Sequence, residues 1–135
     1  MDDFAVVVTA GSLRSGREGA VRLPHRWTPE GVEVEAPFTG AHLLHLAVAG
    51  CVLIDVYREA ARLGVGVSGV RVSARGVFDT RTWASTGISY AVGLDSPAPA
   101  AAVVRLLDAV DEVAEIPRAV RHGAPVTREH DGARP

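Results

Sequence analysis

The segment from Ala41 to Leu63 constrains the fold more than any other part of this 135-residue chain. It contains no proline and only one glycine, Gly50, and Gly64 follows it as a residue suited to a left-handed helix end. The segment therefore predicts one helix of about 35 Å. We expect its nearly apolar first half to be buried all round, and its amphipathic second half, Asp55–Arg62, to turn polar residues to water. The expected apolar stripe is Leu44, Ala47, Val48, Cys51, Ile54 and Ala61.

Shorter segments rich in β-branched residues lie on both sides of this helix and predict strands. They are Phe4–Ala10, Ala20–Leu23, Gly31–Glu35, Val65–Phe78 with a bulge at Ser68–Gly69, Ser85–Leu94 and Ala124–Thr127. A second helix is expected from a cap at Asp95 or Ser96 to about Ala114, and a short third helix over Ile116–Arg121. The order βββ-α-ββ-α-(α)-β predicts an α+β class with mostly antiparallel pairing. We expect one domain over residues 1–135, with a flexible tail from about residue 129.

The composition excludes several classes of protein. Fourteen basic against 16 acidic residues give a net charge of −2, which supplies no strong field for nucleic acid or an anionic membrane. The longest apolar run, Ala47–Ile54, is far shorter than the ~20 residues of a membrane span. A single cysteine and the absence of a recognisable signal peptide predict a cytoplasmic protein without an internal disulfide.

Cys51 is the first candidate for chemistry, and its surroundings leave two interpretations open. It lies in the most apolar stretch of the long helix, where burial raises the pKa of a thiol and leaves it inert. No basic residue lies one helical turn away, and Asp55 at the next turn carries the wrong sign to stabilise a thiolate. Alternatively, Arg14 and Arg17 in the glycine-rich loop at residues 11–19 could fold over the sulfur and lower its pKa.

His42 and His45 are the second candidates, because a spacing of three residues can present two imidazoles to one metal. No third ligand follows at a matching spacing. An interface or a polar edge of the core is therefore their expected setting, and we predict no metal and no cofactor. The phosphate loop, the dinucleotide-binding fingerprint and the hydrolase nucleophile elbow do not occur in the sequence.

The residues around Cys51 resemble the central helix of the OsmC/Ohr superfamily, which comprises osmotically inducible protein C and the organic hydroperoxide resistance proteins. The run Ala41–Cys51 is similar to the superfamily's N-P-E-x-L-x-x-A-x-x-A-C signature. Further similar segments are Arg62–Val65, Gly69–Val72, Gly123–Val126, Glu115–Pro117 and the loop Gly16–Gly19, which matches G-R-[DE]-G. These segments occur in the order that the superfamily has, over nearly the whole chain.

The resemblance implies an OsmC-like fold, an intertwined homodimer with two sites at its interface, and a thiol-dependent peroxidase. In such a site Cys51 would attack the hydroperoxide, Arg17 would activate the sulfur, and a second cysteine would resolve the sulfenic acid. This chain departs from the pattern at two places. Ile116 stands where the resolving cysteine is expected, and Gly40-Ala41, followed by His42, stands where the superfamily has Pro-Glu.

Two functions follow from these observations. The first is a one-cysteine peroxidase that reduces an organic hydroperoxide at Cys51 and Arg17 and is recycled by an external thiol. His42, His45, Arg14 and Ile116 are its expected substrate-binding or supporting residues. The alternative is a non-catalytic module whose apolar pocket at the dimer interface holds an apolar small molecule. A pKa of Cys51 well below the free value of about 8.5 favours the enzyme, and one above that value favours the module.

Overall fold

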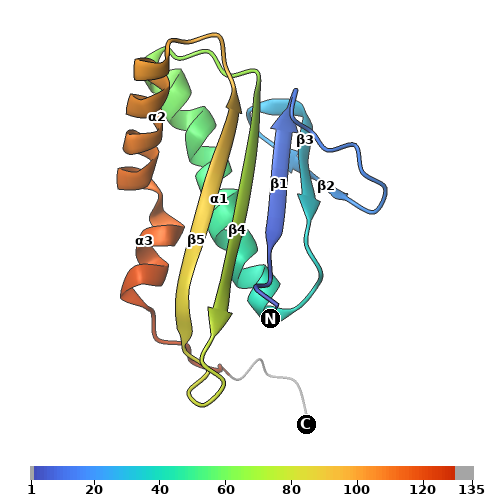
Figure 1. The fold of residues 1–135 in the computed structure, drawn as a ribbon, viewed down its shortest axis with the longest axis vertical. Coiled ribbons are helices and arrows are strands. Elements are labelled where there is room, and N and C mark those ends of the chain that lie inside the picture. Colours follow the sequence, from blue (N-terminus) through green and yellow to red (C-terminus); the bar gives the residue numbers. More distant parts are fainter. Residues whose placement is uncertain (1, 130–135) are drawn as a thin grey trace.

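The computed structural model describes residues 2–129 and confirms the α+β class, with one sheet and three helices (Figure 1). The strands are β1 (Val6–Gly11), β2 (Val21–His25), β3 (Thr28–Glu35), β4 (Gly69–Phe78) and β5 (Ser85–Asp95). The helices are α1 (Gly40–Leu63), α2 (Ala100–Val113) and α3 (Glu115–His122). All strand pairs are antiparallel, and the strand order in the sheet is β2-β3-β1-β4-β5.

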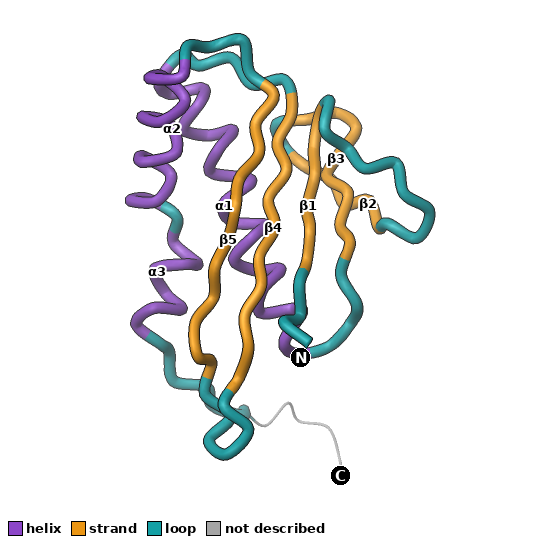
Figure 2. Tube along the Cα trace, viewed as in Figure 1, coloured by secondary structure: helices purple, strands orange, loops and turns teal. Residues whose placement is uncertain are grey.

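The alternation of side chains along β1 separates the two faces of the sheet. Val6, Val8 and Ala10 are buried and belong to the core that α1 closes. Val7 and Thr9 therefore point to the opposite face, which we call the outer face. Because β1 pairs with both β3 and β4, this division extends across the middle of the sheet. Figure 2 shows α1 crossing behind the strands, with α2 and α3 following one another beside it.

The long helix begins and ends almost where the sequence predicts. The Thr39 hydroxyl caps it by accepting a hydrogen bond from the His42 backbone N–H at 3.2 Å. Gly64 closes it in the left-handed conformation, with φ 69° and ψ 30°. These two residues fix where α1 starts and stops.

The buried face of α1 differs from the prediction. Val48, Ala49, Val52, Leu53 and Val56 form it, whereas the rest of the expected stripe is half-buried or exposed, with the exposed fraction of Ile54 at 40%. The sheet and the other two helices cover only part of the circumference of α1, so its first half is not buried all round in a single chain. Conversely, Asp55 and Glu59 are buried rather than turned to water.

Three further expectations are wrong. Residues 124–127 form no strand, so the described chain ends on α3 and the loop after it. β4 pairs regularly at Gly69, and the irregularity in its register lies instead between Gly76 and Phe78. α2 begins later than predicted, because the Ser96 side chain does not cap it and instead bonds the Gly66 carbonyl, in the loop between α1 and β4, and the Ala98 N–H. Residues 130–135 of the expected tail lie outside the described residues.

α1 is long and apolar enough to satisfy the length and composition of a membrane span. Its most apolar window has a mean hydropathy of 1.6, and 56% of that window is buried inside the fold. A core helix of a soluble protein has the same character, so this property is weak evidence for a span.

Candidate functional site

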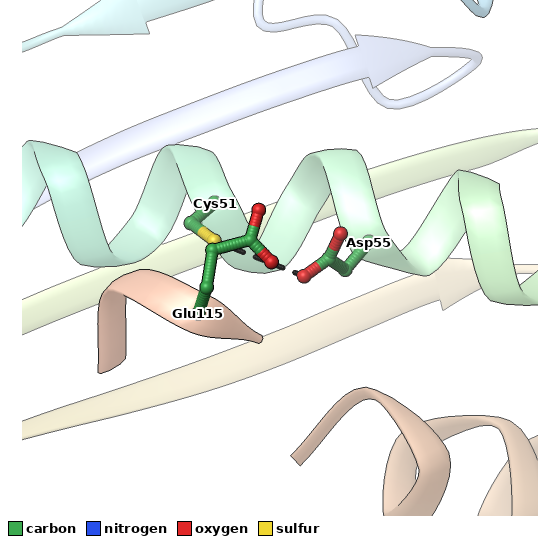
Figure 3. A group of neighbouring side chains, drawn as sticks. All are labelled: Cys51, Asp55 and Glu115. Carbon is green, nitrogen blue, oxygen red and sulfur yellow. Dashed lines mark hydrogen bonds between the residues drawn. The ribbon is translucent and has the colours of Figure 1, made fainter. Parts of the chain in front are cut away.

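Cys51 lies half-buried on α1, on the side that faces the start of α3. Figure 3 shows two carboxylates beside it, Asp55 from the next turn of α1 and Glu115 from the first turn of α3. The thiol donates to Oδ2 of Asp55, with 3.8 Å between sulfur and oxygen. One ligand atom from each of the three side chains lies within 4.8 Å of the others. We call these three residues the thiol cluster.

The electrostatics of the thiol cluster oppose ionisation of the sulfur. Burial is the largest cause that raises the pKa of Cys51, and the negative charges of Asp55 and Glu115 raise it further. A hydrogen bond from the backbone N–H of Ile116 acts in the opposite direction. The arrangement within one chain therefore favours the protonated form of Cys51.

Asp55 is itself an unusual residue, because only 1% of it is exposed. Burial raises its pKa first, and Glu115 adds to that increase, while Arg58 lowers it. The Arg58 guanidinium lies 3.0 Å from Oδ1 of Asp55, but its own side chain is half exposed, so water screens this ion pair. Burial thus raises the pKa of two neighbouring groups, the thiol and the carboxyl of Asp55.

The thiol cluster has donor atoms that a metal ion could use, one sulfur and several carboxylate oxygens. Asp55, however, already accepts the hydrogen bond of the thiol and pairs with Arg58. The carboxylate of Asp55 therefore contacts the thiol and the Arg58 guanidinium within the chain.

Arg17, the expected activator, lies on the other side of the sheet. One of its guanidinium nitrogens is 3.5 Å from Oε1 of Glu35, and its side chain is 77% exposed. With Val7 and Thr9 it lines a cavity of about 230 Å³ on the outer face. Cys51 lies on α1, which packs against the opposite face. A single chain therefore does not bring these two residues together.

The loop that carries Arg17 is fastened to the outer face. Glu33 accepts hydrogen bonds from the Ser15 hydroxyl at 2.9 Å and from the Gly16 N–H at 2.8 Å, and both lower its pKa. Arg14 turns back into the same loop, where its Nε donates to the Gly11 carbonyl at 3.2 Å. Arg14 therefore also lies away from the thiol cluster.

His42 and His45 anchor the start of the chain instead of supporting Cys51. His45 is fully buried, with Nδ1 2.9 Å from the Phe4 carbonyl oxygen and its ring stacked on Phe78. His42 places Nδ1 2.6 Å from the Thr39 hydroxyl and its ring edge against Phe4. Both residues thus have structural contacts at the first turns of α1.

A cavity of about 390 Å³ lies next to the thiol cluster, between α1, β5 and α3. We call it the α1–α3 cavity. It is lined by Val48, Ser85, Thr86, Gly87, Ile88, Tyr90, Pro117, Val120 and Arg121. Val48 lies one turn before Cys51 on α1, and Pro117 directly follows Ile116 on α3. Ile116 is thus the one supporting residue of the prediction that the structure places at the sulfur, through its backbone.

A protein-family model described as OsmC-like protein matches residues 35–129. This chain belongs to the OsmC-like family. A solved OsmC-like hydroperoxide resistance protein from Jannaschia sp. CCS1 has the same fold, with a TM-score of 0.58 over 96% of this chain and 95% of that one. The two sequences are 20% identical. A comparison with curated proteins found no match.

The OsmC-like assignment covers the segment that holds α1, the thiol cluster and the α1–α3 cavity. It confirms the resemblance seen in the sequence. Glu115 and Arg121 were not predicted as site residues. Both lie on α3, and only the packing of α3 against α1 brings them to this region.

Proposed function

We propose that this OsmC-like chain is a non-catalytic binding module whose α1–α3 cavity holds an apolar small molecule. The observation that carries the proposal is the pair of carboxylates at Cys51, which together with burial raises the pKa of the thiol. A peroxidatic cysteine must be a thiolate, and each unit of increase in pKa removes about nine-tenths of the remaining thiolate at neutral pH. The arrangement within one chain therefore disfavours the thiolate on which a peroxidase depends.

The cavity supports the binding role independently. Val48, Ile88, Pro117 and Val120 supply an apolar lining, and hydroxyl groups of β5 supply a few polar atoms. A volume of about 390 Å³ lies at the lower end of the range for small-molecule sites, about 300–1,000 Å³. In this account Cys51 packs next to the cavity without reacting.

A second candidate is the one-cysteine peroxidase, which the Gly16–Gly19 loop and the Ile116 N–H at the sulfur favour. The Cys51 thiolate would attack the O–O bond of an organic hydroperoxide, giving a sulfenic acid and releasing the alcohol after protonation. Two external thiols would then reduce the sulfenic acid, forming their own disulfide and water. In this account the activating Arg17 would come from a second copy of the chain.

The rate of Cys51 oxidation separates the two functions. We would expose the protein to cumene hydroperoxide and to hydrogen peroxide and trap sulfenic acid for mass spectrometry, with Cys51→Ser as the blank. The binding module predicts a rate no faster than that of a free thiol. Fast and selective reaction with the organic peroxide would overturn it in favour of the peroxidase.

We also infer that the chain forms a homodimer in the cytoplasm. The side of α1 that carries Leu43, Ala47 and Ile54 is apolar and exposed in the single chain, and a second copy would cover it. The single cysteine fits a reducing compartment. Size-exclusion chromatography with light scattering should show a dimer, and a stable monomer at low micromolar concentration would contradict it.

A further inference from the structure

We propose that Arg121 is an anion anchor at the α1–α3 cavity, so that the preferred ligand is a small carboxylate with an apolar tail. This inference rests on the proposed binding function and names the class of molecule that the cavity would take.

The charge of the cavity points to an anion. Arg121 is the one charged residue among those that line it, and no carboxylate accompanies it. Within residues 2–129 Arg121 forms no ion pair. A guanidinium offers a planar pair of N–H donors, which matches the two oxygens of a carboxylate.

The apolar residues that line the cavity indicate that the rest of the ligand is apolar. Val48 and Ile88 form an apolar wall from α1 and β5, and Pro117 and Val120 line the cavity from α3. Arg121 follows Val120 directly, so the charge lies next to the apolar wall. The volume of about 390 Å³ suits a short or medium aliphatic chain better than a long lipid. A medium-chain carboxylate satisfies both the charge and the volume.

A larger cavity of about 900 Å³ elsewhere in the molecule is a poorer match for such a ligand. It lies against Phe4, Phe78 and Trp83, and its lining includes Asp2 and Asp79 as well as Arg81. Two carboxylates against one guanidinium repel an anion. The charge of the lining therefore favours the smaller α1–α3 cavity for this class of ligand.

Calorimetric titration of the full chain with octanoate and with octanol tests the anchor. These two probes share a tail and differ in the charge of the head group. We expect octanoate to bind the unmodified protein more tightly than octanol does. Arg121→Gln should weaken the binding of octanoate about tenfold or more, because it removes a charge-assisted hydrogen bond. The affinity for octanol should stay unchanged.

Arg118→Gln is the matched control. Arg118 is also an exposed arginine of α3, but its guanidinium contacts the Glu112 carbonyl and does not line the cavity. This variant should bind both probes as the unmodified protein does. An equal loss of octanoate affinity in both arginine variants would contradict the role of Arg121 as an anchor, since it would show a general effect of charge.

The two probes also separate the anchor from the proposed function. If octanol binds as tightly as octanoate, the anchor is wrong and the binding module stands. If neither probe binds the unmodified protein, both proposals fail. The comparison of probes uses the unmodified protein, so it decides the matter even if Arg121→Gln does not fold.

Discussion

Two neighbouring regions between α1 and α3 have opposite electrostatic character. In the thiol cluster, Asp55 and Glu115 place negative charge beside Cys51. In the α1–α3 cavity, Arg121 is a cation with no carboxylate among the lining residues. The two regions are one helical turn apart on α1. Within one chain the thiol therefore lies beside carboxylates, whereas the cavity next to it has a guanidinium and no carboxylate among its lining residues.

The contrast depends on the burial of Asp55. A carboxylate that is 1% exposed has little water to stabilise its charge, and the pair with Arg58 compensates for only part of that loss. The same environment raises the pKa of the adjacent thiol. Cys51 and Asp55 share a hydrogen bond, so a change at either residue alters the proton affinity of the other.

Removing the negative charges is expected to have the largest effect on this contrast. The double variant Asp55→Asn, Glu115→Gln should lower the pKa of Cys51, because both charges that raise it are lost. The rate of alkylation by iodoacetamide at pH 7 should then increase about tenfold for each unit of decrease in pKa.

Asp111→Asn provides the matched control for that variant, since Asp111 is an exposed acidic residue of α2 outside the thiol cluster. It should leave the alkylation rate unchanged. An unchanged rate in the double variant as well would show that the carboxylates do not hold the proton on Cys51.

The stability of the protein at alkaline pH should show a smaller effect of the same thiol. The pKa of Cys51 is raised in the folded state, so the unfolded chain loses its thiol proton first as the pH increases. The free energy of unfolding should therefore decrease as the pH rises from about 8.5 toward the folded-state pKa. Urea titrations at several pH values should show this decrease in the unmodified protein and less of it in Cys51→Ser. An identical pH dependence in both proteins would contradict the raised pKa.

The smallest expected effect is that of Arg17, which lies on the outer face. Arg17→Ala should leave the alkylation rate of Cys51 within about twofold of the rate in the unmodified protein. The reason is that the guanidinium pairs with Glu35 on the far side of the sheet. Arg14→Ala, from the same loop, is the reference for a general effect of the loop. A marked slowing in Arg17→Ala alone would show that Arg17 of a second copy reaches the thiol, and would favour the peroxidase.

The sequence alone predicts the elements of this fold well, because local signals carry them. The absence of helix breakers between Ala41 and Leu63, with Gly64 after them, defines α1 almost to the residue. Its buried face could not be predicted, since its first half is apolar on nearly every side. Only the packing of the sheet and the other helices decides which side is covered.

The site was predicted less completely, because most of it depends on contacts between distant segments. Cys51 and the unfavourable charge of Asp55 are visible from helical spacing. Glu115 is 64 positions further along the chain, and its approach to the sulfur depends on how α3 packs against α1. The separation of Arg17 from Cys51 likewise follows from which face of the sheet the loop crosses.

The most direct test of the account is the pKa of Cys51 in the unmodified, fully assembled protein. We would measure the alkylation rate of Cys51 from about pH 6 to pH 10.5, with free cysteine as the reference. We expect a midpoint above that of the free thiol, about 8.5. A midpoint well below that value would contradict the central claim, since it would show a thiolate at neutral pH and a site fit for peroxidase chemistry.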